Sequence, residues 1–422
     1  MKNAFKSLTG VKPEENASIC WALLYIISLF LSYYVLRPIR DELGVANGID
    51  KLPWLFTGTL VVMLLISPAF AYIVRKFPRR KFICLSYRFL ALNLVIFAAL
   101  FSISTPAVSV WVSRAFFIWV SVFNLFAISV FWSFVVDIFN SEQGKRLFGI
   151  LSAGATLGGL LGASLTSILV KHIGHSGLLI ISVIFIEFSV YASKKLSSES
   201  QVENAGEIST TSTISSGNIF SGMLHTFRSP YLLGLALFIL LYSLTSTFLY
   251  YQQASIAAQN FTSQTERTSF FANIDIIVNA LTLFIQIFVT GKVMRRFGIM
   301  LTLCALPLIS MIGFSMLAVY PALCFLVAAQ VARRVSNFAF ARPSREVLFT
   351  SSSREDRYKA KNFIDTVVYR GGDQAASWGY AMLAGLGLSI SQLAIIAVPI
   401  SLVWFCISIW LGKKFHNITT EV

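Results

Sequence analysis

The sequence predicts an all-α membrane protein whose twelve transmembrane helices form two six-helix bundles. Three observations predict this class. First, the chain of 422 residues is 56% hydrophobic and only 13% charged, about half the charged fraction of a typical soluble domain. Second, apolar runs of about 20 residues recur along the whole chain, each long enough to cross the hydrocarbon core of a bilayer. Third, one polar stretch divides these runs into two sets of six.

The apolar runs predict spans at residues 19–36, 54–74, 82–104, 108–136, 147–170, 176–193, 230–252, 269–291, 300–319, 322–341, 362–385 and 389–412. The polar residues before the first span are not typical of a cleavable signal peptide, so we expect this span to be retained. Residues 197–218 are rich in Ser, Thr and Glu and cannot bury enough apolar area to fold alone. We therefore expect bundles at residues 1–196 and 229–422, joined by a cytoplasmic linker at 197–228.

The distribution of basic residues predicts how the chain lies in the membrane. A net charge of +15 would by itself suit a nucleic-acid partner. Most of the 34 Lys and Arg residues, however, fall on one side of the predicted spans, and the opposite loops hold only Arg37, Arg40, Lys51, Lys171 and Arg267. Because cytoplasmic loops carry an excess of basic residues, we expect both termini in the cytoplasm. Topology thus explains the basicity, and no nucleic-acid partner is expected.

Two pairs of similar segments indicate an internal repeat. The segment "AYIVRKFPRR" (71–80) follows the second span, and "GKVMRRFGIM" (291–300) follows the eighth. In the same order, "DIFNSEQGKRLFG" (137–149) resembles "EVLFTSSSREDRYKAKNF" (346–363). Together the pairs predict a parallel repeat, which places a binding site near the bilayer midplane and works by rocking of one half against the other. This is the architecture of the major facilitator superfamily fold.

Two groups of residues are expected to take part in gating. Gly154, Gly158 and Gly162 recur every four residues in the fifth span, so they share one helix face. Small residues on one face let a neighbouring backbone approach closely, either as static packing or as a sliding gate contact. The second group consists of basic residues in the repeated segments: Arg75, Arg79, Arg295 and Arg296.

Ionisable residues inside the predicted spans mark a candidate transport path. A charge near the bilayer centre is costly, so it normally faces a wet cavity or a partner. The deep residues are Arg114, Arg333, Arg334, Arg370, Glu187, Asp275 and Asp373, whereas Arg88 lies close enough to the cytoplasmic side to reach it. Guanidinium groups in such a path suit an anionic substrate, because they form bidentate hydrogen bonds to carboxylate or phosphate oxygens. The alternative is that they pair with the acids and lock the helices together.

The end of the first span carries the densest charge. The stretch "SYYVLRPIRDELGV" (32–45) places Arg37, Arg40, Asp41 and Glu42 within six positions, with Pro38 among them. These arginines lie at the periplasmic end, against the positive-inside bias, so topology does not account for them. We interpret them as an anion gate, which the two acids screen between substrate visits.

Other function classes find little support. The chain has no nucleotide-hydrolysis motif and no arrangement of side chains typical of catalysis, so no enzyme is expected. The 5 Cys lie in apolar segments without ligand spacing, and His172 and His175 fall in a short polar loop. These patterns favour ordinary core residues, and neither a metal nor another cofactor is expected.

Three blocks resemble the ATP:ADP antiporter family of plastids and intracellular bacteria, in particular its shorter bacterial branch. They are "YYVLRPIRDELGV", "SVFWSFVVDIFNSEQGKRLFGILSAGATLGGLLG" and "FARPSREVLFTSSSREDRYKAKNFIDTVVYRGGD". The resemblance implies a twelve-helix carrier that exchanges nucleotides. It places family functional positions at Arg37, Arg40, Asp137, Glu266, Lys359 and Lys361. Two of these depart from the family, since Arg40 stands where the exchangers have Lys and Asp137 where they have Glu.

The sequence therefore predicts a secondary transporter that moves an anionic metabolite by alternating access, and ATP:ADP exchange is the favoured hypothesis for its activity. Arg37 and Arg40 would attract the anion, and Arg114, Arg333 and Arg370 would neutralise it midway. The carboxylates Asp41, Asp137, Glu187, Asp275 and Asp373 would serve as charge partners, with Asp275 or Glu187 able to carry a coupling proton. We expect a monomer in a bacterial inner membrane, with a small anion and the lipid bilayer as its partners.

Two alternatives remain open at this point. One is a proton-coupled importer or exporter of an organic anion, such as a carboxylate siderophore. The other is a membrane receptor or assembly partner that has the fold of a carrier and transports nothing.

Overall fold

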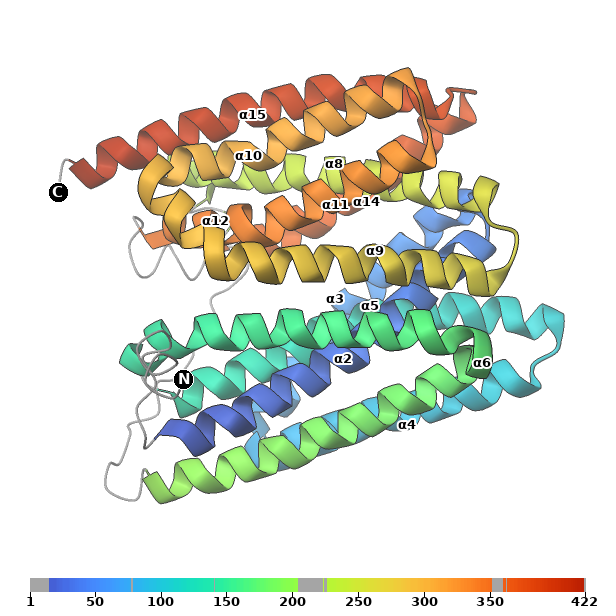
Figure 1. Cartoon of the computed structure of the whole chain (residues 1–422), viewed down its shortest axis with the longest axis vertical. Coiled ribbons are helices and arrows are strands. Elements are labelled where there is room, and N and C mark those ends of the chain that lie inside the picture. Colours follow the sequence, from blue (N-terminus) through green and yellow to red (C-terminus); the bar gives the residue numbers. More distant parts are fainter. Residues whose placement is uncertain are drawn as a thin grey trace. The chain divides into compact units, whose positions relative to one another are not determined.

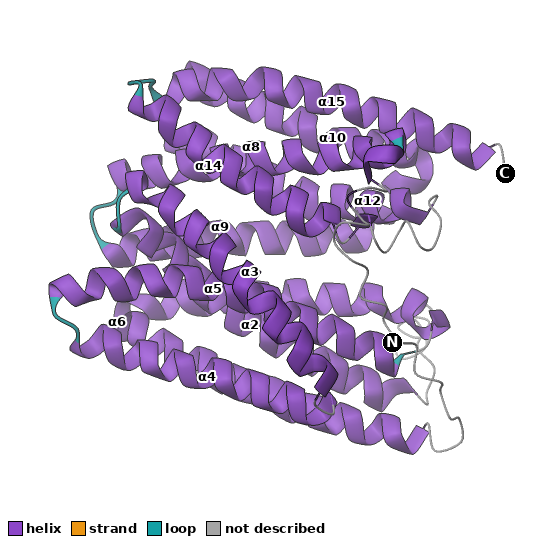
Figure 2. Cartoon of the chain, turned by 180° about the vertical axis from the view of Figure 1, so that it is seen from behind, coloured by secondary structure: helices purple, strands orange, loops and turns teal. Residues whose placement is uncertain are grey.

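The computed structural model describes residues 15–76, 79–139, 141–203, 223, 226–350, 360–361 and 363–420. These residues form helices joined by short turns (Figure 2), which confirms the predicted all-α class. In chain order (Figure 1), the main helices are α2 (Asn16–Ala46), α3 (Leu52–Lys76), α4 (Arg79–Ile103), α5 (Pro106–Ile138), α6 (Ser141–Glu203), α8 (Pro230–Asn260), α9 (Gln264–Ile285), α10 (Gly291–Val319), α11 (Leu323–Ser336), α12 (Arg342–Thr350), α14 (Tyr369–Gly385) and α15 (Ile390–Thr420).

Eight helical segments in the described part are long and apolar enough to cross a membrane. The prediction of a polytopic membrane protein is therefore confirmed, but the number of twelve spans is not. Two of the eight segments contain a break at a glycine with positive φ, Gly174 in α6 (φ 61°) and Gly298 in α10 (φ 74°). Positive φ costs glycine little, so these glycines let the chain turn where the sequence pattern predicts a boundary between spans.

The predicted tenth and eleventh spans are not uniform α-helices. The tenth corresponds to α11, of 14 residues, continued by a π-helical turn at Asn337–Ala341. The eleventh corresponds to a π-helical turn at Ile364–Val368 followed by α14, of 17 residues. A third π-helical turn, Gln286–Thr290, follows α9. Each turn interrupts the regular α-helical repeat, and such turns often lie at functional sites.

Contacts within the chain divide it into two compact units. Unit 1 contains residues 1–47, 58–211 and 262–283, and unit 2 contains residues 48–57, 212–261 and 284–422. Each unit therefore includes a segment from the far side of the polar stretch at 197–218. The expected bundle boundaries at 1–196 and 229–422 stay a prediction.

In unit 1, α6 runs beside α2 and α4 (Figure 1). The glycine face predicted for the fifth span lies against α2. A Cβ at Gly158 would come 2.4 Å from the carbonyl oxygen of Ile27, and a Cβ at Gly162 would come 2.4 Å from that of Leu31. These glycines allow helix α6 to touch the backbone of α2, as small-residue faces do in membrane proteins.

Aromatic and hydroxyl groups complete the two cores. In unit 1, the Tyr25 hydroxyl donates to that of Tyr87 at 2.6 Å, and Tyr87 donates to the carbonyl of Ala127 at 2.9 Å, so α2, α4 and α5 are tied together. In unit 2, α10 packs along α15 and α8 packs on α14 and α15. The rings of Phe238 and Trp404 meet edge to face there, with centroids 5.4 Å apart. These cores hold the helices that carry the buried charges.

Candidate functional site

A charge cluster in unit 1 joins the end of α2 to α9. We call it the α2 cluster and define it as Arg37, Arg40, Asp41 and Asp275. Arg37 Nη1 lies 3.2 Å from Asp275 Oδ1, and its Nε lies 3.9 Å from Asp41 Oδ2. Arg40 Nη1 lies 3.2 Å from Asp41 Oδ1. Both acids are buried, with Asp275 only 2% exposed, while both arginines keep some exposure. The cluster therefore presents partly accessible guanidinium groups held by buried carboxylates.

Helical spacing and aromatic rings explain how the arginines are held. Tyr34, Arg37 and Asp41 follow one another at intervals of three and four residues, so they share a face of α2. The guanidinium of Arg37 lies over the ring of Tyr34 at 5.6 Å, and that of Arg40 lies over Phe117 of α5 at 4.2 Å. Cation–π contacts of this kind help to hold the two guanidinium groups in place beside the carboxylates that pair with them.

Glu42, the next acid on α2, is held by different partners. It is fully buried, and its Oε1 accepts from Arg267 Nη2 at 2.9 Å and from Arg267 Nε at 3.3 Å. Gln264 Nε2 donates to Oε2 at 3.2 Å and also lies 3.3 Å from Nδ1 of His175. Sequence reasoning grouped Glu42 with the arginines of α2 and left Arg267 in an outer loop. In the structure the pair Glu42–Arg267 fastens α9 to α2.

Arg114 lies near the end of α2. Its Nε donates to Asn47 Oδ1 at 3.3 Å, and its guanidinium lies over the ring of Trp111 at 4.8 Å. Phe117, which supports Arg40, is three residues further along α5, so it shares a face with Arg114. The structure therefore brings the predicted residues Arg40 and Arg114 to the same region of unit 1.

Arg333 in unit 2 is deeply buried, only 3% exposed. Its Nε donates to Ser310 Oγ at 3.1 Å, and Nη1 donates to Ser246 Oγ at 3.2 Å. Its Nη2 donates to the Tyr242 carbonyl at 3.0 Å and to Thr245 Oγ1 at 3.1 Å. All four partners are uncharged oxygens. They satisfy the hydrogen bonds of the guanidinium but leave its positive charge in place.

A carboxyl group, Asp373, lies on α14 and is 8% exposed. Its Oδ1 is 2.6 Å from Ser243 Oγ and 3.1 Å from Thr247 Oγ1, both on α8. Its Oδ2 lies 3.4 Å from Nη1 of Arg370. The predicted residues Arg370 and Asp373 thus form a loose pair at positions i and i+3 of one helix.

Two tyrosine rings, tilted against each other, lie between the two arginines of unit 2. The guanidinium of Arg333 lies 5.0 Å from the ring centroid of Tyr242, and that of Arg370 lies 5.5 Å from the ring of Tyr369. The two rings lie 6.0 Å apart at an interplanar angle of 38°, and Asn337 donates to the Tyr242 hydroxyl at 3.0 Å. We call Arg333, Tyr242, Tyr369 and Arg370 the Arg–Tyr cluster. It combines two cations with two aromatic faces.

Sequence reasoning missed the segment of α8 that contacts both Arg333 and Asp373. Residues 242–247, "YSLTST", carry a hydroxyl at five of six positions inside an apolar span. Tyr242, Thr245 and Ser246 contact Arg333, and Ser243 and Thr247 contact Asp373. This density of hydroxyl groups in a membrane helix was a signal that could have marked the site.

Other predicted residues lie apart from these clusters. Arg88 Nε lies 3.6 Å from Glu187 Oε1, and both side chains are about half exposed. Asp137 is exposed in the last turn of α5. Arg295 donates to the carbonyl of Gly291 in the preceding turn, at 3.2 Å.

The remaining predicted residues are only partly described. Arg296 is exposed beside Phe297, and Lys361 pairs with Glu346. Glu266 accepts from the backbone N–H of Ser263 at the start of α9, at 3.4 Å. Predicted residues outside the described part are Lys359 and the side chains of Arg75 and Arg79.

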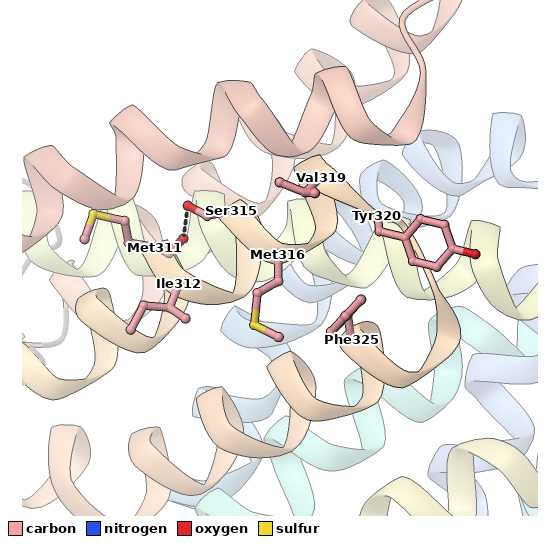
Figure 3. A pocket seen from close by; sticks show the side chains of 7 residues that line it. All are labelled: Met311, Ile312, Ser315, Met316, Val319, Tyr320 and Phe325. Carbon is pink, nitrogen blue, oxygen red and sulfur yellow. Dashed lines mark hydrogen bonds between the residues drawn. The ribbon is translucent and has the colours of Figure 1, made fainter.

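A groove on α10 and α11 contains none of the predicted residues (Figure 3). It has a volume of about 690 Å³ and is lined by Met311, Ile312, Ser315, Met316, Val319, Tyr320 and Phe325. Its one serine hydroxyl donates to the Met311 carbonyl at 2.9 Å, as the dashed line in Figure 3 shows. No charged side chain lines this groove, so its chemistry suits apolar chains rather than an anion. Among the described residues, no group of three His, Cys, Asp or Glu is placed to hold a metal.

Comparison with known proteins gives two kinds of match in sequence. A family model described as Major Facilitator Superfamily matches residues 19–358. ADP,ATP carrier protein 2 of Chlamydia pneumoniae is 22% identical over 219 residues, which cover 46% of this chain and 41% of the carrier. ADP,ATP carrier protein 1 of Chlamydia trachomatis serovar D is 24% identical over 226 residues, which cover 48% and 42%. The chain thus aligns with less than half the length of these relatives.

Solved structures match over nearly the whole chain. A bacterial homologue of the human lysosomal transporter Spinster has a TM-score of 0.63 at 14% identity, over 97% of this chain and 99% of that one. A POT family transporter in complex with 5-aminolevulinic acid has a TM-score of 0.66 at 12% identity, over 94% and 96%. The nucleoside transporter NupG has a TM-score of 0.62 at 12% identity, over 96% and 100%.

At such low identities these structures show the fold alone, and that fold is the one the internal repeat predicts. The match to the family model covers most of the chain, and it agrees with the long apolar helices of the structure. The chain is a multi-pass membrane protein that belongs to the Major Facilitator Superfamily.

Proposed function

We propose that the protein is a secondary active transporter of an anionic metabolite, and that nucleotides are the first class to test. The observation that carries this proposal is Arg333, a buried guanidinium held by four uncharged oxygens. A full charge inside a membrane protein is costly unless a counter-charge or water offsets it. An anionic substrate in unit 2 would supply that counter-charge.

The Arg–Tyr cluster narrows the chemistry of this anion. Arginine forms bidentate hydrogen bonds to phosphate and carboxylate oxygens. The ring faces of Tyr242 and Tyr369 offer a surface on which a planar group can stack. A nucleotide has both parts. The ADP,ATP carriers of Chlamydia and the resemblance at Arg37 and Arg40 support the same class. An organic anion would use the two arginines without the tyrosines.

The α2 cluster would receive the anion in unit 1. Arg37 is held by Asp275 and Asp41, and Arg40 by Asp41, so an arriving anion would compete with these carboxylates. Arg114 would add a further positive charge. This competition would couple binding to the release of α9, which is the kind of differential contact that alternating access requires.

Several further assignments belong to the same proposal. The protein would work as a monomer in a bacterial inner membrane with both termini in the cytoplasm. The glycine face of α6 and the basic residues Arg75, Arg79, Arg295 and Arg296 would take part in gating. Asp137 would act near the cytoplasmic end of α5.

The test is an uptake panel in proteoliposomes with labelled ATP, ADP, inorganic phosphate and a set of organic anions. The variants Arg333→Gln and Arg370→Gln should lose most of the uptake seen with the wild-type protein. Arg88→Gln is the matched control, because its guanidinium is half exposed and pairs with Glu187, and it should keep full uptake. Movement of an organic anion but not of ATP or ADP would overturn the nucleotide assignment. Unchanged uptake in both arginine variants would overturn the anion site. If the wild-type protein moves no anion at all, a non-transporting role is favoured instead.

A further inference from the structure

The hydrogen bonds around Ser243 contain one proton too few if Asp373 is ionised. Ser243 Oγ lies 2.8 Å from the carbonyl oxygen of Tyr369 and 2.6 Å from Asp373 Oδ1. Both distances are those of good O–H···O hydrogen bonds. A backbone carbonyl only accepts, and an ionised carboxylate only accepts, but a serine hydroxyl has a single hydrogen to give. One of the two contacts would then place two lone pairs against each other.

We propose that Asp373 carries a proton in this state of the transporter and that this proton is co-transported with the anion. The Asp373 O–H donates to Ser243 Oγ, and the Ser243 O–H donates to the Tyr369 carbonyl. Every short contact then has a hydrogen, and Thr247 can still donate to the Asp373 oxygen at 3.1 Å. The proposal rests on the proposed function for its anion and on the geometry of unit 2 for its proton.

The surroundings of Asp373 agree with a neutral carboxyl. The group is buried, and burying a neutral carboxyl costs far less than burying a carboxylate. Its distance of 3.4 Å to Arg370 is longer than the 2.7–2.9 Å typical of charged N–H···O pairs. The charged and titratable groups nearby are Arg370 and Tyr369 on α14, Tyr242 and Tyr251 on α8, and Arg333 on α11, which contacts α8.

Loss of the proton would rearrange these contacts in a defined way. The proton leaves Oδ1 for water, and the Asp373 carboxylate that remains attracts both the Ser243 O–H and the guanidinium of Arg370. Ser243 then no longer donates to Tyr369, the residue at which the π-helical turn Ile364–Val368 joins α14. Arg370 becomes neutralised by Asp373 and is no longer available to an anion.

The coupling follows from this competition for Arg370. The anion finds a free guanidinium only while Asp373 is protonated, so proton and anion are bound together and are carried in the same direction. Lower pH should strengthen anion binding, and bound anion should raise the affinity of Asp373 for its proton, because such linkage is reciprocal.

The first experiment needs no substrate. Infrared difference spectra of the purified full-length protein in liposomes, recorded over a range of pH, report the carbonyl stretch of protonated carboxyl groups. The wild-type protein should show a protonated-carboxyl band that Asp373→Asn removes and that Glu187→Gln, the control at a half-exposed pair, keeps. The asparagine variant has nearly the shape of the original side chain, so we expect it to fold. A spectrum that Asp373→Asn leaves unchanged would overturn the proposal.

The second experiment tests the coupling with labelled ADP and with the best-transported anion of the uptake panel. In the wild-type protein an inward proton gradient should drive accumulation. In Asp373→Asn this accumulation should fall about tenfold, within the range usual for coupled ligands, while exchange of internal for external anion continues. Uptake that ignores the proton gradient in the wild-type protein would overturn the coupling and leave the proposed function standing. If no anion moves, the proposed function and the coupling both fail, and the infrared band alone then decides whether Asp373 holds a proton.

Discussion

At the scale of single residues, this protein holds the positive charges of its helices in two different ways. In unit 1, Arg37, Arg40 and Arg267 each lie within 4 Å of a carboxylate. In unit 2, Arg333 is held by hydroxyl and carbonyl oxygens. The first arrangement joins α2 to α9 through Arg37 and Arg267, and the second gives Arg333 only uncharged hydrogen-bond partners.

Arg333→Lys should not replace the arginine, although the charge is kept. Lysine is a single point donor and cannot reach in three directions as a guanidinium does. We expect anion uptake to fall at least about tenfold, the effect of losing roughly 1.4 kcal/mol of binding free energy. The fold should persist, because Ser310 and Thr245 also donate to carbonyls in their own helices at 2.9 and 2.8 Å. Uptake kinetics together with size-exclusion profiles would check both parts, and full activity in the lysine variant would contradict the role given to the guanidinium.

Glu42→Gln should destabilise the protein, because it leaves Arg267 without its buried counter-charge. Removing one partner of a buried ion pair typically costs roughly 3–5 kcal/mol. The double variant Glu42→Gln with Arg267→Gln should recover much of this loss, since neither charge is then left alone. Thermal unfolding of the purified variants measures the cycle. Additive losses in the double variant would show that the two residues do not act as a pair.

At the scale of elements, the contact between α6 and α2 depends on two glycines. Gly158→Ala and Gly162→Ala each place a methyl group 2.4 Å from a backbone carbonyl of α2, so one helix must move. Such overpacking costs about 1–3 kcal/mol, and we expect a lower unfolding temperature and lower uptake. Gly149→Ala on the same helix is the control, because a Cβ there meets nothing within 4 Å. Equal effects at 149 and 158 would contradict the close contact.

Much of the element order was predictable, because long apolar runs in a membrane protein have few alternatives to helix. The glycines at 174 and 298 mark two of the boundaries. The π-helical turns could not be predicted, since they depend on contacts between helices. For example, the side chain of Gln286, in the turn Gln286–Thr290, donates to the carbonyl of Phe338, in the turn Asn337–Ala341, at 3.3 Å. An apolar run does not tell which helices will be neighbours.

The candidate site was predictable to a similar degree. Depth along a span marked Arg333, Arg370 and Asp373, because the rise of a helix is regular. The orientation of a residue around its helix was not predictable where the span is apolar on all sides. Glu187 therefore looked like a member of the transport path, whereas it forms a half-exposed pair with Arg88. Arg267 and the hydroxyl segment 242–247 could be identified as partners of the buried charges only from the packing of the helices in the structure.

At the scale of the whole molecule, each unit draws on both sides of the polar stretch at 197–218. Unit 1 includes residues 262–283, and unit 2 includes residues 48–57. The buried carboxylate of Glu42 pairs with Arg267, and Arg37 pairs with Asp275. Both pairs require the part of the chain that follows the polar stretch. These ion pairs therefore join residues from the two sides of the polar stretch.

A protein split within the polar stretch should consequently behave as a pair of fragments that need each other. The fragment 1–210 expressed alone would leave the fully buried carboxylate of Glu42 and the guanidinium of Arg37 without their α9 partners, and we expect it to be degraded. Expressed together with 211–422, it should accumulate and regain uptake. Fragment levels in membranes, with and without the second fragment, measure this dependence. Because ion pairs of α2 are completed only by α9, we expect the first part of the chain to reach its stable fold only after the second part has been synthesised.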